Sequence, residues 1–316
     1  MQIASLIFPV FAVIVTGWIV GWTGYLPRAL SDALVHFAYN IAMPALLVVT
    51  IAQEPGRSLI NWSFLIAFGG GSMLCFVVVF TIARLRGVRD LGSQALYGMT
   101  AAMTNTGFVA LPVLRAIYGE PAVLPAAIAT VFVAVVMFPA TVVLLEIEQR
   151  AKRITSSGPV VLVRHILLNP MVLSTLLGML IAALGIRLPS PVVDYLNIFA
   201  DALTPCALFA IGLGLSIEGL RAYLGPSLAL SVVKLILMPA LVYALSVALG
   251  LDPLYTIAAV ICAGVPTAKT IYILAGEYRC EEMMVASTIS MTTLGSVASL
   301  IGWIYLLSGL QVPVGG

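Results

Sequence analysis

The sequence predicts an all-α integral membrane protein whose ten transmembrane helices form two inverted five-helix repeats. Of its 316 residues, 61% are hydrophobic and 9% are charged, and the mean hydropathy is +1.13, whereas soluble domains carry roughly a quarter charged residues. The apolar runs reach the ~20 residues that cross ~30 Å of hydrocarbon, and they must be helical because lipid offers no partner for backbone N–H and C=O groups. The stretch from Pro9 to Pro44 recurs from Pro170 to Pro205 at an offset of 161 residues, which indicates a duplication.

Each predicted helix follows one apolar run, and the runs fall into two sets of five. They cover residues 3–22, 30–53, 60–83, 92–118 and 122–145 in the first set, and 167–186, 191–217, 224–250, 253–276 and 283–308 in the second. Residues 1–147 are therefore predicted as the first repeat and 167–316 as the second, with 148–166 as a short cytoplasmic linker. Because each half holds an odd number of spans, the halves face opposite ways, as in many secondary transporters.

Positive charges gather on one side of the predicted spans. The basic residues on that side are Arg28, Arg84, Arg86, Arg89, Arg150, Lys152, Arg153, Arg164, Arg221 and Arg279. Arg57 and Arg187 lie on the other side, and Arg115 lies near the end of span four. By the positive-inside rule the first group is cytoplasmic, so both termini are expected outside. The net charge of +2 mostly reflects this bias, so we expect no nucleic-acid partner.

Chemistry is expected where polar residues enter the membrane, and span four contains such a set. The run from Met103 to Pro112 places Asn105, Thr106 and Gly107 at mid-depth. Pro112 offers no N–H to the preceding turn and clashes with the carbonyl four residues back, while Gly107 lets the chain unwind. We therefore expect the helix to be interrupted between Gly107 and Pro112.

Span nine repeats this pattern in the second half. Gly264, Val265, Pro266 and Thr267 lie at the corresponding depth. Two ordinary proline kinks would also explain these residues, since membrane helices tolerate them. Matched interruptions in two repeats are, however, the strongest sequence indication of a transporter site, with the broken helices crossing at mid-membrane. Two half-helix N-termini, each worth about half a positive charge, would attract an anion there.

Lys269 adds a charge to this predicted site. It follows Pro266 by three residues and lies too deep for its ammonium to reach water easily. An ionisable group inside the membrane is a functional candidate by default, so we expect Lys269 to face the substrate. The alternative is a structural ion pair with a buried acid such as Asp201. Arg115, one turn beyond Pro112, is expected to be an interfacial anchor.

Three further polar residues lie deep in the predicted spans. Asp201 and Lys234 are expected to differ in depth by about one helix turn. They form either a structural ion pair or a site that exchanges a proton or sodium ion during the transport cycle. Asn40 occupies the repeat position of Asp201, four residues before Pro44. It is expected either to contact substrate or to cap a carbonyl that the proline frees.

The sequence lacks the arrangements typical of metal centres and catalytic sites. Its four cysteines lie in apolar spans or at a helix end, without metal-ligand spacing. His36 lies near the cytoplasmic end of span two and His165 in the linker, so neither can supply a nucleophile–base pair in the membrane. We therefore expect no enzyme activity, no metal, and no cofactor beyond a coupling proton or sodium ion.

Three stretches of the chain resemble the auxin efflux carrier family. They are Phe37–Leu47, Asn105–Pro112 with the following Ala116–Glu120, and Pro266–Ala268 with the following Leu274–Tyr278. The likeness covers essentially the whole chain. It implies a bile-acid-symporter-like fold with scaffold and transport domains, substrate at the crossover of helices four and nine, elevator-type movement and a homodimer. The linker is short where plant members carry a long loop, so the chain looks like a bacterial member of the inner membrane, whose relatives include malonate and malate carriers.

We therefore expect a secondary transporter of small organic anions, with a dicarboxylate such as malonate or malate as first choice. The predicted substrate-binding residues are Asn40, Asn105, Thr106, Gly107, Pro112, Gly264, Val265, Pro266, Thr267 and Lys269, and the predicted coupling residues are Asp201 and Lys234. An exporter of auxin-like aromatic weak acids is the alternative within this class. Lys269 stands where plant auxin carriers are expected to have an apolar residue, which favours a more highly charged substrate. A channel or membrane sensor is the alternative from another class.

Overall fold

The computed structural model describes residues 2–27, 29–53, 61–151, 170–214 and 223–310, and most of these residues are helical. The α-helices in chain order are α1 (Gln2–Trp22), α2 (Ala29–Phe37), α3 (Met43–Gln53), α4 (Trp62–Phe64), α5 (Gly71–Leu85), α6 (Leu91–Ala102), α7 (Leu111–Tyr118), α8 (Val123–Phe132), α9 (Phe138–Ala151), α11 (Pro170–Ala183), α12 (Ser190–Leu213), α13 (Leu224–Val232), α14 (Met238–Ala248), α15 (Pro253–Gly264), α16 (Thr270–Glu277) and α17 (Glu282–Leu307). Within the described segments there is no β-strand. The predicted linker begins inside α9, and its residues 152–166 lie outside the described part of the chain.

Several α-helices are preceded by a π-helical turn, which in most cases joins them to the helix before. These turns are η1 (Ala38–Ala42), η2 (Leu65–Gly70), η3 (Thr106–Ala110), η5 (Val133–Met137) and η6 (Val233–Leu237). Four of them end two residues before a proline, namely Pro44, Pro112, Pro139 and Pro239. A proline lacks the N–H of the ladder and its ring collides with the carbonyl four residues back, and the wider π turn moves that carbonyl. The helices therefore pass through these prolines without breaking.

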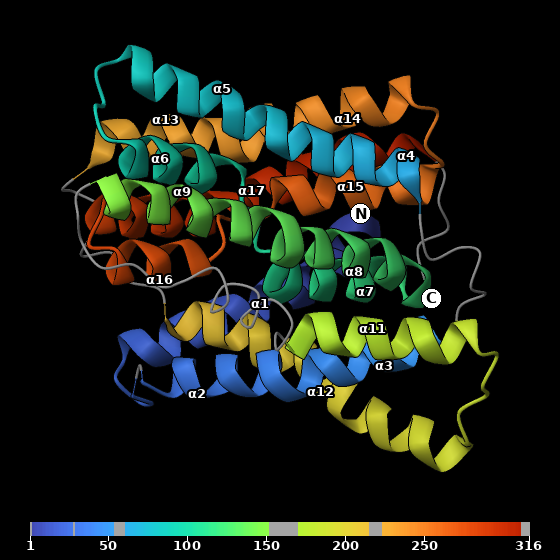
Figure 1. The fold of residues 1–316 in the computed structure, drawn as a ribbon. Helices are drawn as coiled ribbons and strands as arrows, with labels where there is room; N and C mark the ends of the chain where they lie inside the picture. The colour runs from blue at the N-terminus through green and yellow to red at the C-terminus, as the bar shows by residue number, and fades with distance from the viewer. Residues whose placement is uncertain (1, 28, 54–60, 152–169, 215–222, 311–316) are drawn as a thin grey trace.

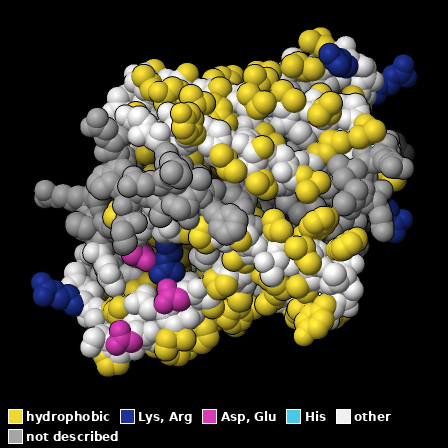
Figure 2. Space-filling view, turned by 180° about the vertical axis from the view of Figure 1, so that it is seen from behind, with side chains coloured by type: hydrophobic (Ala, Val, Ile, Leu, Met, Phe, Trp, Pro, Cys, Tyr) yellow, Lys and Arg dark blue, Asp and Glu magenta, His cyan; other side chains and the backbone are white. Residues whose placement is uncertain are grey.

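The helices have the length and surface of membrane segments. In the segments that the structure describes, six continuous helices are long and apolar enough to cross a bilayer, and shorter apolar helices cover Ala12–Trp22, Thr106–Tyr118, Leu173–Ala183 and Pro253–Gly264. Large apolar side chains such as Ile198 and Leu306 are each 71% exposed, which suits a surface solvated by lipid. Figure 2 shows this surface: hydrophobic side chains cover much of the face, and many of the charged side chains lie toward its two ends.

The helices pack into two groups, which Figure 1 shows one above the other. We call the lower group, α1 to α3 with α11 and α12, the α12 group, and the remaining helices the crossover group. Inside the α12 group, α1 and α12 bring their backbones into contact through small residues. A Cβ added to Gly17 would overlap the carbonyl oxygen of Phe209, and one added to Gly212 would overlap that of Ile14. Close approach at glycine is how membrane helices associate without a hydrophobic driving force.

Candidate functional site

Two interrupted helices of the crossover group meet at their breaks. One runs from α6 through Met103–Asn105 into η3 and α7, and the other runs from α15 through Val265–Lys269 into α16. Thr104 and Thr267 form an antiparallel bridge. The Asn105 N–H donates to the carbonyl oxygen of Pro266 at 2.9 Å, and the Ala268 N–H donates to that of Met103 at 3.1 Å. Backbone groups that lose their helical partners thus pair with each other, as a site away from water requires.

The threonine hydroxyls differ between the two sides of this bridge. Thr267 Oγ donates to the carbonyl oxygen of Thr100 at 2.7 Å, and the Thr267 N–H donates to Thr292 Oγ at 3.3 Å. Thr104 Oγ is buried without a hydrogen-bond partner. Sequence reasoning did not single out Thr100 or Thr292, although the spacing of Thr288 and Thr292 by one helix turn is a signal for a polar face on the last span.

The first break lies earlier in the chain than predicted. The sequence predicted an interruption of the helix between Gly107 and Pro112, but Gly107 lies in η3 and Pro112 in the first turn of α7. The N–H groups of Val109 and Ala110 both reach the carbonyl oxygen of Asn105, at 3.1 and 3.4 Å. The π turn accommodates Pro112, so the unwound residues are the ones that pair with the second break. In the second half, Gly264 ends α15, and Val265 and Pro266 lie in the break itself.

Two polar side chains lie at the start of the first half-helix after its break. Asn105 is 8% exposed and Thr106 is 2% exposed. The Asn105 side chain makes no capping hydrogen bond to η3, so its carboxamide can donate a hydrogen bond to another group. Asn105 directly precedes η3 and Lys269 directly precedes α16, which puts one polar residue and one charged residue at the two helix N-termini.

Lys269 lies where the two helix groups meet. A Cβ on Gly214, which follows the last residue of α12, would lie 3.2 Å from Lys269 Nζ and 2.7 Å from Ser31 Oγ. Ser31 Oγ donates to the Ala210 carbonyl oxygen at 2.7 Å. The charge close enough to act on Lys269 is that of Asp32, but no ion pair with Lys269 occurs among the described residues. Asp201, proposed above as an alternative partner, is bound elsewhere.

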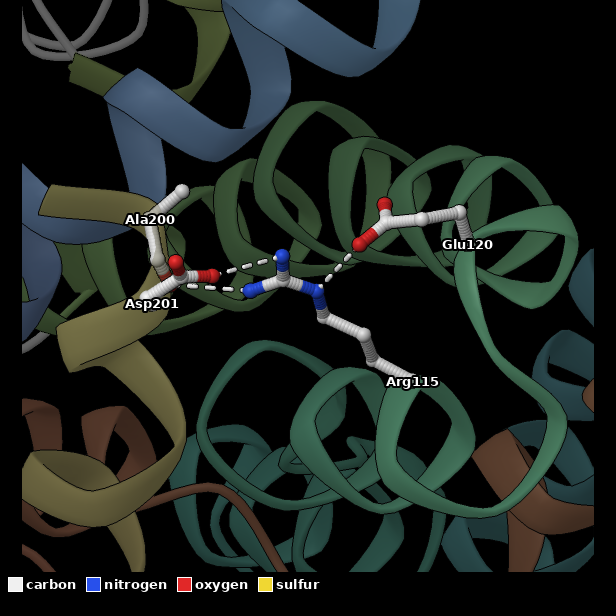
Figure 3. A network of polar contacts seen from close by, with 4 residues as sticks. All are labelled: Arg115, Glu120, Ala200 and Asp201. Carbon is white, nitrogen blue, oxygen red and sulfur yellow. Dashed lines mark hydrogen bonds and ion pairs between the residues drawn. The ribbon is translucent and has the colours of Figure 1, made fainter. Parts of the chain in front are cut away.

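Asp201 pairs with Arg115, as Figure 3 shows. The Arg115 guanidinium donates to Asp201 Oδ1 at 2.9 Å, to the Ala200 carbonyl oxygen at 3.1 Å and to Glu120 Oε1 at 2.7 Å. Arg115 and Glu120 belong to the crossover group, whereas Ala200 and Asp201 lie on α12. The alternative of a structural ion pair between Asp201 and Lys234 is therefore wrong. Arg115, which lies near the end of α7, joins the two helix groups.

Lys234 is 0% exposed and lies in η6. Its ammonium donates to the carbonyl oxygen of Ala263 near the end of α15, and it lies 3.7 Å from Met238 Sδ. Depth along a helix suggested Asp201 as its partner, but the rotation of the helix directs the side chain toward the crossover instead. Asn40 Nδ2 donates to the His36 carbonyl oxygen at 2.9 Å, one helix turn before Asn40 and not at the carbonyl that Pro44 would free.

Other candidate sites are weak. Among the residues that the structure describes, no three His, Cys, Asp or Glu residues are grouped as metal ligands. A groove of about 690 Å³ between α13 and α17 has a mostly apolar lining that includes Leu228, Leu294 and Trp303. None of its lining residues belongs to either break, and an apolar groove does not suit an anion.

An all-helical membrane protein with paired interruptions in two helices has the architecture of a transporter. The family model described as "Membrane transport protein" matches residues 2–304, and the chain belongs to this family, the auxin efflux carrier family. It is 27% identical to a "Putative malonate transporter" of Rhizobium meliloti (strain 1021), over 99% of this chain and 98% of the relative. It is 25% identical to an uncharacterized transporter of Methanocaldococcus jannaschii (94% and 97% covered), and 22% identical to the uncharacterized transporter YfdV of Escherichia coli K12 (95% and 96% covered).

Proposed function

We propose that this protein is a secondary transporter that carries small organic anions, a dicarboxylate such as malonate or malate, bound where the two interrupted helices cross. The observation that supports the proposal is the pairing of the two breaks, from which we infer that the N-termini of η3 and α16 face one volume. Helix N-termini present unpaired N–H groups and a partial positive charge to an anion. The similarity to a relative named for malonate supports the substrate class.

Each residue near the breaks has a distinct role in this proposal. One substrate carboxylate accepts hydrogen bonds from Asn105 Nδ2 and Thr106 Oγ at the start of η3. The other meets the Lys269 ammonium at the start of α16, which has no ion pair among the described residues. A dicarboxylate suits two positive helix ends and one ammonium better than a monocarboxylate does, because each carboxylate finds its own donor set.

The movement that we propose is of elevator type, with the α12 group as a fixed scaffold and the crossover group as the mobile unit. The two groups are packed separately, and polar contacts such as Arg115 with Asp201 join them. In this arrangement the chain crosses a bacterial cytoplasmic membrane ten times as two inverted repeats, with both termini outside. We also propose a homodimer through the scaffold, and coupling to a proton or sodium gradient.

A proteoliposome assay tests the proposal directly. Purified protein is reconstituted, and uptake of labelled malonate is measured with unlabelled malate, succinate, acetate or indole-3-acetate as competitors. We expect malonate uptake above protein-free liposomes, with competition by dicarboxylates about tenfold stronger than by monocarboxylates, the ratio that one additional charge-assisted hydrogen bond gives. Preferred binding of indole-3-acetate would instead identify the exporter of aromatic weak acids. Carboxylate flux that cannot exchange against internal substrate and never saturates would identify a channel.

A further inference from the structure

The crossover brings together two helix C-termini as well as two N-termini. The helix α6 ends at Ala102 and α15 at Gly264, and the last carbonyls of each have no helical donor. Each end carries about half a negative charge, so the two ends together amount to about one. A site of this kind, buried in a membrane protein, favours a monovalent cation for the same reason that the N-termini favour an anion.

One side chain donates a hydrogen bond to a carbonyl at each of these two C-terminal ends, and the two side chains differ in charge. Cys75 Sγ donates to the carbonyl oxygen of Ala101 at 3.8 Å, and Lys234 Nζ donates to that of Ala263. Ala101 and Ala263 are each the residue before the last of their helix. The donors lie on α5 and η6, which belong to the third predicted span of the first half and the third of the second half. A neutral thiol thus donates to a carbonyl at the end of α6, and an ammonium donates to a carbonyl at the end of α15.

No acidic side chain pairs with the ammonium of Lys234 within the described part of the chain. It is fully buried, and the titratable groups close enough to act on it are the thiols of Cys75 and Cys262. Among the described residues, both ion pairs belong to Arg115. An isolated buried cation is costly unless fixed dipoles replace its water. The C-terminal end of α15 supplies such dipoles directly through the Ala263 carbonyl. The end of α6 lies close by, since Cys75 acts on Lys234 and donates to the Ala101 carbonyl.

We propose that Lys234 is a built-in cation, whose ammonium fills the site at the C-terminal ends of the interrupted helices that a free monovalent cation would otherwise occupy. The protein then needs no sodium or potassium ion at this point to hold the crossover together. The inference rests on the proposed function only for its transport consequence. That consequence is that substrate uptake does not require a sodium ion at this site.

The first experiment measures thermal unfolding of wild type, Lys234→Ala and Cys75→Ala, purified in detergent. Each protein is melted in choline chloride and in sodium, lithium, potassium or methylammonium chloride at equal ionic strength. We expect the wild type to melt at the same temperature in every salt. Lys234→Ala should melt about 5 °C or more lower in choline, and at least one small cation should restore part of the loss with a saturable dependence. Cys75→Ala removes a neutral donor, so no salt should rescue it selectively.

Several results would overturn the proposal. These are a wild type that requires sodium, a Lys234→Ala protein that melts alike in every salt, and selective rescue of Cys75→Ala. If Lys234→Ala does not fold, Lys234→Met decides, because it keeps the aliphatic stem and removes the charge. We expect Lys234→Met to melt below the wild type in every salt, since its side chain leaves no space for an ion. A melting temperature equal to or above that of the wild type would show that the helix ends need no cation.

Transport provides an independent measurement. Uptake of labelled malonate by wild-type proteoliposomes is compared in sodium and choline buffers with the same pH gradient. Equal rates within twofold are expected. Sodium-dependent uptake would overturn the built-in cation while leaving the transporter proposal intact. If uptake is absent in both buffers, the proposed substrate is wrong, and the unfolding experiment still decides the role of Lys234.

Discussion

The two interrupted helices share a backbone arrangement and differ in the charges around it. In both, the chain leaves the helix for a few residues, pairs with the other break, and resumes as a half-helix. The end of α6 is met by the thiol of Cys75, and the end of α15 is met by the ammonium of Lys234. The two breaks therefore share their backbone geometry, while a buried cation meets the helix end at only one of them. Similar backbone geometry in two segments does not imply similar charge around them.

The half-helices beyond the breaks show the same divergence. On α7, Arg115 is held by Asp201, Glu120 and a backbone carbonyl. At the start of α16, Lys269 has no ion pair among the described residues. One cation is thus engaged between the helix groups and the other is available. In the function that we propose, this difference places substrate binding in the second half of the chain and contact between the groups in the first.

The largest effect that tests this assignment is expected from Lys269→Ala. Removing one partner of a buried charge pair costs about 2–5 kcal/mol, so malonate uptake should fall by ~30-fold or more. Expression and melting temperature should change much less, because the charge that disappears has no ion pair in the described structure. Lys269→Arg is the matched control and should keep part of the activity. Wild-type rates for several dianions in Lys269→Ala would make Lys269 structural and erase the proposed difference between the copies.

Much of this arrangement follows from the sequence, for identifiable reasons. Paired Gly and Pro residues at matching depths predicted two interruptions, and in the second half the break contains Pro266 as expected. The exact position of the first break was not predictable. The π turn at Thr106–Ala110 absorbs Pro112, and unwinding falls instead on residues whose backbone groups find partners in the second break.

Side-chain partners were harder to predict than breaks. Position along a helix gives the depth of a side chain, and Asp201 and Lys234 were paired on that basis. Partner choice also depends on helix rotation and on which helices are neighbours, and neither can be read from one sequence. Arg115 therefore reached Asp201, and Lys234 reached the carbonyl of Ala263. A backbone carbonyl acceptor in particular cannot be predicted from residue types, because every residue has one.

A smaller effect is expected from the bond between the helix groups. Asp201→Asn keeps the size of the side chain and removes the charge that faces Arg115, so the contact across the groups weakens while that with Glu120 remains. Asp201 is 69% exposed, and exposed ion pairs are worth about 0–1 kcal/mol. Gradient-driven uptake should therefore change by up to about fivefold, while exchange of labelled substrate across the membrane persists.

Glu120→Gln is the matched control for Asp201→Asn, because it weakens an ion pair of the same arginine inside the crossover group alone. We expect driven uptake within twofold of the wild type in this variant. If Glu120→Gln and Asp201→Asn slow driven uptake equally, Arg115 acts through its local fold and not between the groups. If Asp201→Asn abolishes both driven uptake and exchange and the protein is unstable, Asp201 is a structural brace.

The smallest expected effect separates the two threonines of the bridge. Thr267→Val removes the 2.7 Å hydrogen bond to the Thr100 carbonyl, which should cost about 1 kcal/mol and lower the melting temperature by roughly 2–4 °C. Thr104→Val replaces a buried hydroxyl that has no partner with a methyl group of similar shape, so stability should be unchanged or slightly higher. Both backbones keep their hydrogen bonds, since valine retains its N–H and C=O. Paired melting curves of the two variants therefore measure how far the copies have diverged in their hydroxyl contacts. A lower melting temperature for Thr104→Val than for Thr267→Val would reverse the assignment and place the structural hydroxyl in the first copy.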